Sequence, residues 1–238
     1  NRDDESYELI LNIKNKISKI ITYGMNKNAD INPENFKFRT DLIGEFNKYN
    51  ILAAIAACKQ LGISDNDIKT GIESFVPPLG REEVVYKKDF TVMIDFAHTP
   101  NAFEQILKSV RPMTKSRLIH VFGSAGQRDA SKRPLMGKAS SKYSDIIILT
   151  SEDPRSESVE KICEEIESGI KNHESRTILK VYDRKKAIEA AIGIAEKGDF
   201  VIMTGKSHEK SMNYGHGEDA WDEYEVVRRA ISDKRKAI

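Results

Sequence analysis

Charged residues follow several apolar runs in this sequence, each at the point where a run ends. Such runs are typical of buried strands in a parallel sheet, whose carboxyl ends commonly bind ligands. Carboxylates can accept hydrogen bonds from hydroxyl groups, and guanidinium groups can pair with carboxylates or phosphates. The charged residues at these ends include Asp95, Arg128, Glu152, Asp153, Arg155 and Glu209. We therefore expect one polar ligand site along this edge of a sheet.

Asp95 comes directly after the apolar residues 91–94. The next helix is predicted to begin with Thr99 as its N-cap and Pro100 at its first position. A carboxylate placed here can accept hydrogen bonds from the hydroxyl groups of a ribose. The alternative is a structural role, in which Asp95 and His98 only stabilise the turn. The spacing alone leaves both interpretations open.

Arg128, Lys132 and Arg133 form a basic group after the small residues 123–126. The small residues would let a ligand approach the backbone, and the cations can neutralise a phosphate or a carboxylate. Ser131 is predicted to cap the helix that follows. The alternative is a solvated basic face without a ligand.

Glu152, Asp153 and Arg155 follow the apolar run 145–150. An arginine is the natural bidentate partner of a carboxylate. The alternative is an acidic cap for the helix predicted at residues 157–171. That alternative explains the two acids but not Arg155, because the dipole at a helix start disfavours a cation.

Residues 205–210 follow the apolar run 199–204 and include a Gly-Lys-Ser triplet. A phosphate loop would require a further glycine at the position of Phe200, so this segment is not a phosphate loop. His208 and Glu209 lack the spacing of a zinc-binding helix. We therefore predict no metal site in this chain.

The elements that would position these residues alternate regularly after Arg81. Strands are predicted at residues 84–88, 91–95, 117–122, 145–150, 177–182 and 199–204. Helices are predicted at about residues 99–111, 132–142, 157–171, 184–197 and 219–231. Such alternation is typical of βαβ units, which give an α/β fold with a mostly parallel sheet and helices on both faces.

The first part of the chain lacks this alternation. Its predicted elements are a helix at residues 7–20, candidate strands at 20–24 and 36–40, and helices at 49–58 and 64–75. Ser64 is the predicted N-cap of the last of these. The sequence Pro-Pro-Leu-Gly at residues 77–80 is typical of a linker. We therefore expect two domains, residues 1–79 and 80–238.

Composition excludes several classes of protein. The 238 residues carry a formal net charge of +1, which gives no electrostatic reason to expect nucleic acid or a membrane as partner. Cys58 and Cys163 show neither a disulfide pattern nor metal spacing, which favours reduced thiols in the cytoplasm. No apolar run approaches the roughly 20 residues that span a bilayer. Because the chain begins at Asn1, in what reads as the middle of a folded region, we expect a fragment.

Taken together, these segments resemble the Mur ligases, and most closely the muramyl-tripeptide synthetase branch (MurE type). The matching segments occur in the same order as in the family, and the whole set is far more specific than any single segment. They are residues 1–4 (NRDD), 44–54 (GEFNKYNILAA), 80–83 (GREE), 95–101 (DFAHTPN), 121–129 (VFGSAGQRD), 132–137 (KRPLMG), 150–155 (TSEDPR) and 205–209 (GKSHE).

The resemblance implies an ATP- and Mg²⁺-dependent amide ligase of peptidoglycan precursor synthesis. Such enzymes phosphorylate the terminal carboxylate of UDP-MurNAc-L-Ala-D-Glu, and the amine of a diamino acid then attacks the acyl phosphate. The resemblance assigns residues 1–79 to the end of a central ATPase domain and residues 80–238 to a Rossmann-like C-terminal domain. The phosphate loop, the Mg²⁺ ligands and the UDP-sugar domain of the family have no counterpart in this sequence. We therefore expect the isolated chain to be inactive.

The resemblance also implies roles for single residues. Asn47 and Asn50 would lie near the adenine, Arg81 near the nucleotide phosphates, and Asp95 near the ribose. The incoming amino acid would be bound by Arg128, Glu152, Asp153, Arg155, Gly205 and Glu209. In the family, an arginine at the place of Arg155 accompanies meso-diaminopimelate, whose second carboxylate it can clasp.

Three segments depart from the family pattern. Glu152-Asp153 stands where Asp-Asn is usual, Ser207 replaces a glycine, and residues 124–126 replace Cys-Gly-Gly. These departures leave the identity of the amine open. Two other functions also stay open: a non-catalytic amino-acid-binding module derived from a Mur ligase, and a related ligase such as folylpolyglutamate synthetase. The motifs Asp-Pro-Arg and Gly-Lys-Ser-His-Glu argue against the second.

Overall fold

The central strands of the main sheet are buried along their whole length rather than at every second position. The computed structural model describes residues 1–5, 7–11, 20–171 and 176–236. In it, every residue of β3 (Leu118–Phe122), β4 (Ile146–Leu149) and β6 (Phe200–Thr204) is buried. Strands that are buried on both faces need helices on both sides, as in the parallel sheets of α/β proteins. The predicted α/β class is confirmed.

Six strands form this sheet in the order β1-β2-β6-β3-β4-β5. β1 (Glu83–Lys87) is antiparallel to β2 (Thr91–Asp95). The remaining neighbours, which include β5 (Thr177–Lys180), pair in parallel. The six predicted strands are therefore confirmed, with small shifts at their ends.

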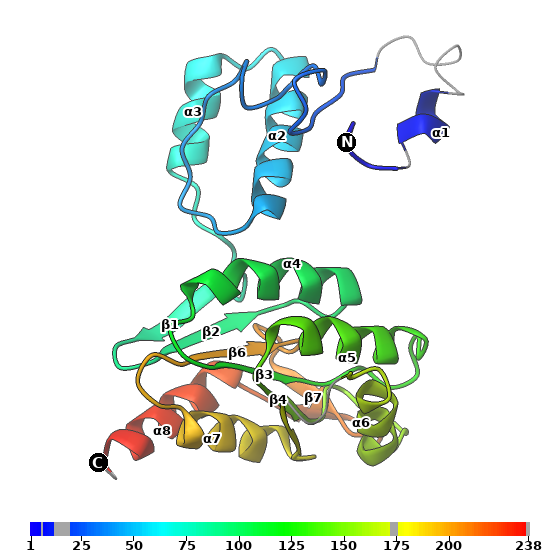
Figure 1. Cartoon of the computed structure of the whole chain (residues 1–238), viewed down its shortest axis with the longest axis vertical. Helices are drawn as coiled ribbons and strands as arrows, with labels where there is room; N and C mark the ends of the chain where they lie inside the picture. Colours follow the sequence, from blue (N-terminus) through cyan, green and yellow to red (C-terminus); the bar gives the residue numbers. More distant parts are fainter. Residues whose placement is uncertain (6, 12–19, 172–175, 237–238) are drawn as a thin grey trace. The chain divides into compact units, whose positions relative to one another are not determined.

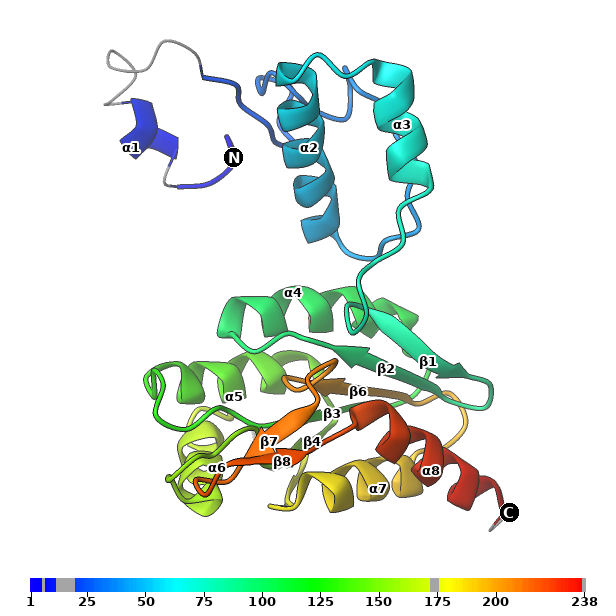
Figure 2. The same ribbon diagram turned by 180° about the vertical axis from the view of Figure 1, so that it is seen from behind.

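Helices cover both faces of the sheet (Figures 1 and 2). One face carries α4 (Pro100–Val110), the 3₁₀ turn η2 (Arg111–Met113), α5 (Lys132–Tyr143) and α6 (Val159–Glu167). The other carries α7 (Arg184–Ile194) and α8 (Glu223–Lys236), which pack on each other. The apolar cluster beneath α7 and α8 includes Val92, Ile119, Val201 and Ile188. This core fixes the positions of the strand ends.

The helices begin at capping residues that the sequence partly reveals. Thr99 accepts a hydrogen bond from the Ala102 N–H at the start of α4, as predicted. Ser131 precedes α5 but its side chain does not cap it, because its backbone is helical (φ −63°, ψ −23°) instead of extended as in a capping residue. The prediction for Ser131 was therefore wrong: its backbone N–H and hydroxyl both donate to the Asp129 carboxylate in a turn.

A small hairpin was missing from the sequence-based prediction. β7 (Ser211–Asn213) and β8 (Glu218–Ala220) pair in antiparallel fashion and form their own sheet. The predicted helix 219–231 therefore starts later, at Glu223. These strands are short, and β8 is exposed at every residue, so they lack the apolar alternation by which strands are recognised.

The chain divides into two units, Asn1–Val76 and Pro77–Ile238, close to the predicted boundary. The first unit contains α1 (Tyr7–Leu11), α2 (Glu45–Gln60) and α3 (Asp65–Glu73). Ser64 caps α3 by accepting from the Asp67 N–H, as predicted. The rest of the predicted helix 7–20 includes residues 12–19, which lie outside the described residues.

The two candidate strands of the first unit were wrong. The side chains of residues 36–40 alternate in burial as predicted, but no described segment pairs with them as a strand. Phe36 and Phe38 pack instead in the apolar cluster of α2 and α3. Residues 20–24 contribute only an isolated bridge between Tyr23 and Ile31. The core of this unit is helical and includes Leu52, Ile55 and Ile68.

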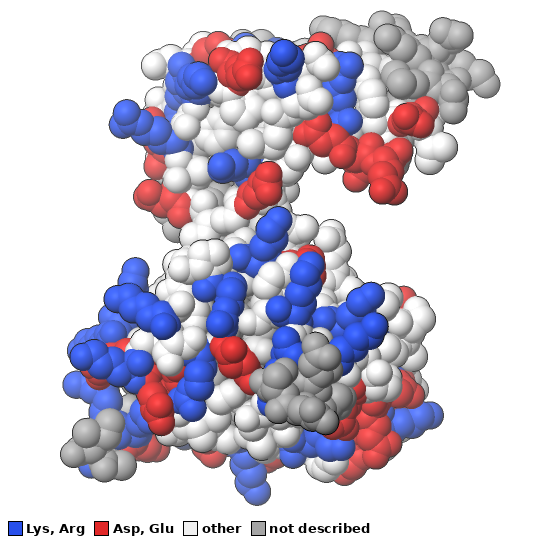
Figure 3. Space-filling model, viewed as in Figure 1, with Lys and Arg blue, Asp and Glu red and all other residues white. Residues whose placement is uncertain are grey.

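Surface charge is mixed on both units. Figure 3 shows basic and acidic side chains interspersed on the face in view, in keeping with the net charge of +1. Among the residues that the model describes, no helix is both long and apolar enough to cross a bilayer.

The contact between α5 and α6 depends on glycine. A Cβ atom at Gly137 would overlap the Ile166 carbonyl oxygen, and one at Gly169 would overlap the Pro134 carbonyl oxygen. α6 and the turn after it, which contains Gly169, therefore approach α5 so closely that no larger residue fits at these positions. By contrast, a Cβ at Gly193 in α7 would meet no atom within 4 Å.

Replacing Gly137 with alanine should destabilise the protein although alanine favours helices. We expect Gly137→Ala to lower the free energy of unfolding by about 1–3 kcal/mol through overpacking. The matched control Gly193→Ala should instead be neutral or raise it, by up to about 1 kcal/mol. Urea unfolding of both variants measures the difference. Equal effects of the two substitutions would contradict the close helix contact.

Candidate substrate-binding site at the carboxyl edge of the sheet

The polar residues predicted from the strand ends leave the sheet at one edge. Parallel pairing sets Asp95 opposite Thr204 and Phe122 opposite Leu149, so β2, β6, β3 and β4 end at the same level. β1 starts at this edge, because it runs antiparallel to β2. Within residues 80–238, the loops that carry the predicted site residues therefore begin next to one another.

Backbone strain is concentrated at this edge. Among the described residues, the non-glycine residues with positive φ are Glu82, Gln127, Asp153, Arg155 and Ser207. All five lie in the loops next to the carboxyl ends of β2, β3, β4 and β6. Such conformations cost of order 1–3 kcal/mol each and persist only where surrounding contacts enforce them, most often at functional sites. The strain therefore marks this edge independently of residue type.

A buried ion pair lies beneath the edge. Arg184 and Glu223 have no exposed side-chain surface and are joined by two hydrogen bonds, of 2.8 and 2.6 Å. The same guanidinium donates to the carbonyl oxygens of Ser151 (3.3 Å), two residues after the end of β4, and of Thr204 (2.8 Å), the last residue of β6. The Trp221 indole N–H also donates to Glu223, at 3.0 Å. Arg184 thus fixes the two strand ends from which the central loops emerge.

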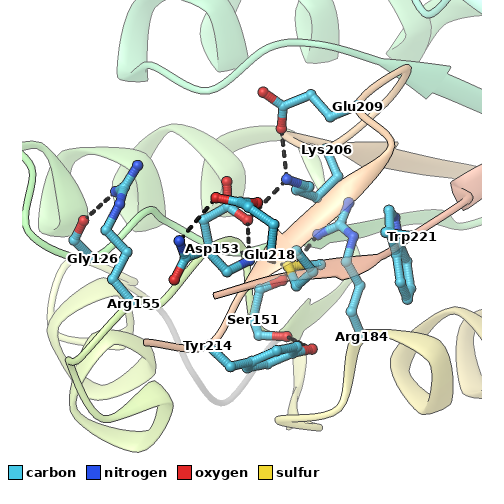
Figure 4. A network of polar contacts seen from close by, with 12 residues as sticks. Gly126, Ser151, Asp153, Arg155, Arg184, Lys206, Glu209, Tyr214, Glu218 and Trp221 are labelled. Atoms are coloured by element: carbon cyan, nitrogen blue, oxygen red, sulfur yellow. Dashed lines mark hydrogen bonds and ion pairs between the residues drawn. The ribbon is translucent and has the colours of Figure 1, made fainter. Parts of the chain in front are cut away.

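Lys206 lies at the centre of a polar network that Figure 4 shows. Its ammonium group is 2.9 Å from Oδ1 of Asp153 and 2.7 Å from Oε2 of Glu209. The lysine side chain is 1% exposed, whereas those of Asp153 and Glu209 are 20% and 40% exposed. Oδ1 of Asp153 also accepts the backbone N–H of Asn213 in β7. Two acids that sequence analysis assigned to the site are therefore held together by a buried cation.

Glu152 is a buried acid in the loop after β4. Burial raises the pKa of its carboxyl to about 8, although Arg184, Lys132 and Lys206 act in the opposite direction. Its Oε2 atom is buried without a hydrogen-bond partner. Gly205, which has a φ of +99°, lies against this oxygen and leaves no room for a Cβ atom. Glu152 is therefore protonated and neutral at neutral pH.

Arg155 is half-buried and lies across the loop that follows β3. Its Nη1 donates to the Gly126 carbonyl oxygen, and its backbone N–H donates to the Asn213 carbonyl oxygen at 2.9 Å. A Cβ atom at Gly126 would overlap the Pro154 carbonyl oxygen. The small residues 123–126, which we expected to admit a ligand, instead admit the neighbouring loop. Arg128 lies on the same loop and is exposed.

The basic group predicted after β3 is divided by the fold. Arg133 is 1% exposed and pairs with Glu157 at 2.9 Å and Glu165 at 2.6 Å. The ammonium of Lys132 donates to the His98 carbonyl oxygen at 3.0 Å. Arg133 is thus a structural residue, because two acids of the following segment neutralise it. Arg128 is the member of the group that stays exposed.

Asp95 is buried and connects the start of β1 to the end of β2. Its two oxygens accept the backbone N–H groups of Glu82 (2.9 Å) and Ala97 (2.7 Å). The structural role that we considered for Asp95 is thus present, while each carboxylate oxygen keeps further acceptor capacity. Arg81 is exposed, and its guanidinium lies 4.7 Å from the centre of the Phe96 ring.

Asn47 and Asn50 belong to the first unit. They share one face of α2, where the Asn50 side-chain amide donates to Oδ1 of Asn47 at 3.2 Å. The Asn47 amide donates to the Ile43 carbonyl oxygen at 2.8 Å. Asn47 is buried and Asn50 is exposed, so the second amide is open to a ligand.

Sequence reasoning missed Arg184, Glu223 and Lys206 as organisers of this edge. Arg184 had a usable signal, since it directly follows the N-cap Asp183, where the helix dipole disfavours a cation. Lys206 was described only as part of a polar strand end. Its signal is its position two residues after a strand that is buried throughout. Glu223 had no local signal, because its partner lies 39 residues away.

Comparison with known proteins agrees with this architecture. The family model described as Mur ligase, glutamate ligase domain matches residues 80–207, which is more than half of the chain. This chain is 44% identical over 249 residues to the UDP-N-acetylmuramoyl-L-alanyl-D-glutamate--2,6-diaminopimelate ligase of Aquifex aeolicus (strain VF5). The match covers 97% of this chain and 50% of that protein, so the chain spans about half the length of such relatives.

Solved structures show the same fold. A structure of a UDP-N-acetylmuramoyl-L-alanyl-D-glutamate--2,6-diaminopimelate ligase aligns with a TM-score of 0.64 and 29% identity, over 98% of this chain and 52% of that one. The UDP-N-acetylmuramate-alanine ligase of Thermotoga maritima aligns with a TM-score of 0.59 at 17% identity, over 84% of this chain and 40% of that one, which shows the fold alone. From the family match, the relatives and the fold together, the chain belongs to the Mur ligase family, in the branch that resembles the 2,6-diaminopimelate ligases.

Proposed function

We propose that this chain is the amino-acid-binding part of a cytoplasmic, ATP-dependent Mur ligase that adds meso-diaminopimelate to UDP-MurNAc-L-Ala-D-Glu. The observation that carries the proposal is the position of Arg155 on the same loop as Asp153, whose carboxylate is joined through Lys206 to Glu209. The far end of meso-diaminopimelate bears a carboxylate and an ammonium group. A guanidinium can bind the carboxylate through two parallel hydrogen bonds, and carboxylates can accept from the ammonium.

In this assignment, residues 80–238 are the C-terminal domain of the ligase and residues 1–79 are the end of its central ATPase domain. The match of the glutamate ligase model to residues 80–207 supports the first part. The motifs at residues 1–4 and 44–54 support the second. The product would be a precursor of peptidoglycan, and the activity would serve cell-wall synthesis.

The proposed reaction forms an amide from an acid and an amine. Bound ATP supplies a phosphoryl group to the terminal carboxylate of UDP-MurNAc-L-Ala-D-Glu. The amino group of diaminopimelate attacks the carbonyl carbon of the resulting acyl phosphate and forms a C–N bond. The bond between that carbon and the phosphate oxygen breaks, phosphate leaves, and the amine loses a proton. The residues of this chain would bind and orient the amine. Arg155, Arg128, Asp153 and Glu209 would bind its charged groups, and Gly205 and the neutral Glu152 would line the pocket.

Arg81 and Asp95 are suited to bind the nucleotide. Arg81 presents an exposed guanidinium to phosphate oxygens, and Asp95 has acceptor capacity left for ribose hydroxyls. Asn47 and Asn50 carry amides that can pair with the edge of adenine. Among the described residues, no group of three or more His, Cys, Asp or Glu side chains could hold a metal ion. The proposal therefore includes no Mg²⁺ ligand from these residues.

A non-catalytic binding module derived from a Mur ligase is the second candidate. The absence of a phosphate-loop pattern from the 238-residue sequence favours it for the isolated chain. A folylpolyglutamate synthetase is less well supported. The Mycobacterium tuberculosis folylpolyglutamate synthase structure is 20% identical, a level at which only the fold is shared.

Removing the guanidinium of Arg155 should weaken binding of meso-diaminopimelate to this chain. For a half-buried pair we expect Arg155→Ala to cost about 2 kcal/mol, or roughly 30-fold in dissociation constant. Calorimetric titration with meso-diaminopimelate measures the effect. The affinity of the variant for L-lysine, which lacks the second carboxylate, should fall much less.

Arg229→Ala is the matched control for Arg155→Ala. Arg229 is an exposed arginine of α8 that pairs only with Glu225 of the same helix among the contacts described, and its replacement should leave both affinities unchanged. Equal affinity of wild type and Arg155→Ala for meso-diaminopimelate would remove Arg155 from the site.

The isolated chain should not complete the ligation. With UDP-MurNAc-L-Ala-D-Glu, ATP, Mg²⁺ and meso-diaminopimelate, we expect no phosphate release above background, because no phosphate loop holds the ATP phosphates. The Aquifex aeolicus 2,6-diaminopimelate ligase assayed in parallel is the positive control. Robust turnover by the 238-residue chain would overturn this expectation.

Glu152 should make stability depend on pH. Its pKa is about 8 in the folded protein and about 4.3 in the unfolded chain, so stability falls as pH rises between these values. Glu152→Gln removes this loss. We expect the unfolding free energy of Glu152→Gln relative to wild type to increase between pH 5 and pH 8 by on the order of 3 kcal/mol. Urea unfolding at both pH values tests this, and parallel pH profiles would show that Glu152 ionises normally.

A further inference from the structure

Lys206 combines a buried position with two partners that reach solvent. Its side chain is 1% exposed and contacts Asp153 and Glu209, which come from the loops after β4 and β6. A cation that served only to bind a ligand would be expected nearer the surface. A lysine in this position can influence a ligand only through the two carboxylates in front of it.

The charge of the site depends on this lysine. Around neutral pH, Glu152 is protonated because burial raises its pKa to about 8. The ionised acids of the network are then Asp153, Glu209 and the exposed Glu218. They face Lys206 and Arg155, while Arg184, also drawn in Figure 4, is neutralised by Glu223. Without Lys206, these three acids would outnumber Arg155 by two.

The balance between acids and cations affects which charged groups the side chain of a bound amino acid can bring into the site. A lysine-type ligand ends in an ammonium group alone, which an uncompensated acidic wall attracts. A diaminopimelate-type ligand also brings a carboxylate, which the same wall repels. Compensation of Asp153 and Glu209 by Lys206 leaves room for that carboxylate beside Arg155.

We propose that Lys206 is a specificity-determining positioning residue, which neutralises the Asp153 and Glu209 pair so that the site accepts an amino acid with a zwitterionic far end in preference to a simple diamine. The inference rests on the proposed function, because it assumes that the incoming amino acid binds at this edge. It assigns to Lys206 an action on ligand choice, not a contact with the ligand.

A compact ammonium suits this position better than a guanidinium. Lys206 reaches two acids on different loops with separate donors, whereas the fork of an arginine is planar and favours one carboxylate. Asp153 has a further constraint, because its Oδ1 also accepts the Asn213 N–H. An asparagine at this position would keep that acceptor while removing the charge.

The test compares two ligands on four forms of the 238-residue chain: wild type, Lys206→Met, Asp153→Asn and the double variant. Calorimetry gives the dissociation constants of meso-diaminopimelate and L-lysine. We expect Lys206→Met to lower the preference for meso-diaminopimelate over L-lysine at least tenfold. The double variant should recover most of that preference, because removing one acid restores the charge balance.

Lys210→Met is the matched control. Lys210 is an exposed lysine of the same segment that pairs with Asp222, and its replacement should not change the preference. Thermal unfolding of each form shows whether it is folded. For a folded Lys206→Met, equal weakening of both ligands would mean a merely structural role and overturn the inference. If Lys206→Met does not fold, Asp153→Asn provides the test. It should shift the preference toward meso-diaminopimelate. An unchanged preference in Asp153→Asn would also overturn the inference.

The proposed function fails by a different result. If the wild-type chain binds neither amino acid, the assignment of the site fails, and the role of Lys206 fails with it. If wild type prefers meso-diaminopimelate and Lys206→Met keeps that preference, only the role of Lys206 is wrong.

Discussion

The carboxyl edge of the sheet depends on the buried pair of Arg184 and Glu223. Strand ends leave carbonyl groups without sheet partners, and a buried carbonyl must find a donor. Arg184 supplies donors to the carbonyl of Ser151 in the loop after β4 and to that of Thr204 at the end of β6. A guanidinium buried in this way needs an acid beside it, and Glu223 from α8 meets that need. The pair therefore links the C-terminal helix to the two loops that carry the polar network.

Close packing and strained backbone accompany one another at this edge. Gly126 lets the loop after β3 contact the backbone at Pro154, and this contact leaves the following residues in conformations that side chains rarely adopt. Asp153 and Arg155 both have positive φ, yet their positions are fixed by hydrogen bonds to β7. The hairpin that sequence analysis missed is therefore what holds the central loop in place. Preorganisation of this kind limits how far a bound ligand must reorder the site.

The departures from the family pattern have local physical reasons in the structure. The Ser207 hydroxyl, which stands where a glycine is usual, donates to the Gly80 carbonyl oxygen at 2.7 Å and so ties the start of the C-terminal unit to the β6 loop. Glu152 is longer than the usual aspartate and fills the space beside Gly205, where its buried position keeps it protonated. Asp153 stands where asparagine is usual, and its added charge is matched by Lys206. These three changes leave the site close to electrical balance.

The sequence by itself determined the strands and helices of residues 80–238, the edge at which they end and the family, because these follow from local periodicity and from motifs in order. It did not reveal the β7–β8 hairpin, which is too short and polar to leave a periodic signal. Nor could it show which charged residues are buried in ion pairs and which stay exposed. Arg133 and Arg128 look alike in sequence, yet one is buried between two acids and the other is exposed. Only the tertiary structure decided which of the two is buried, because the partners of a buried charge lie on other strands and helices. The order of the strands in the sheet determines which of these elements come into contact.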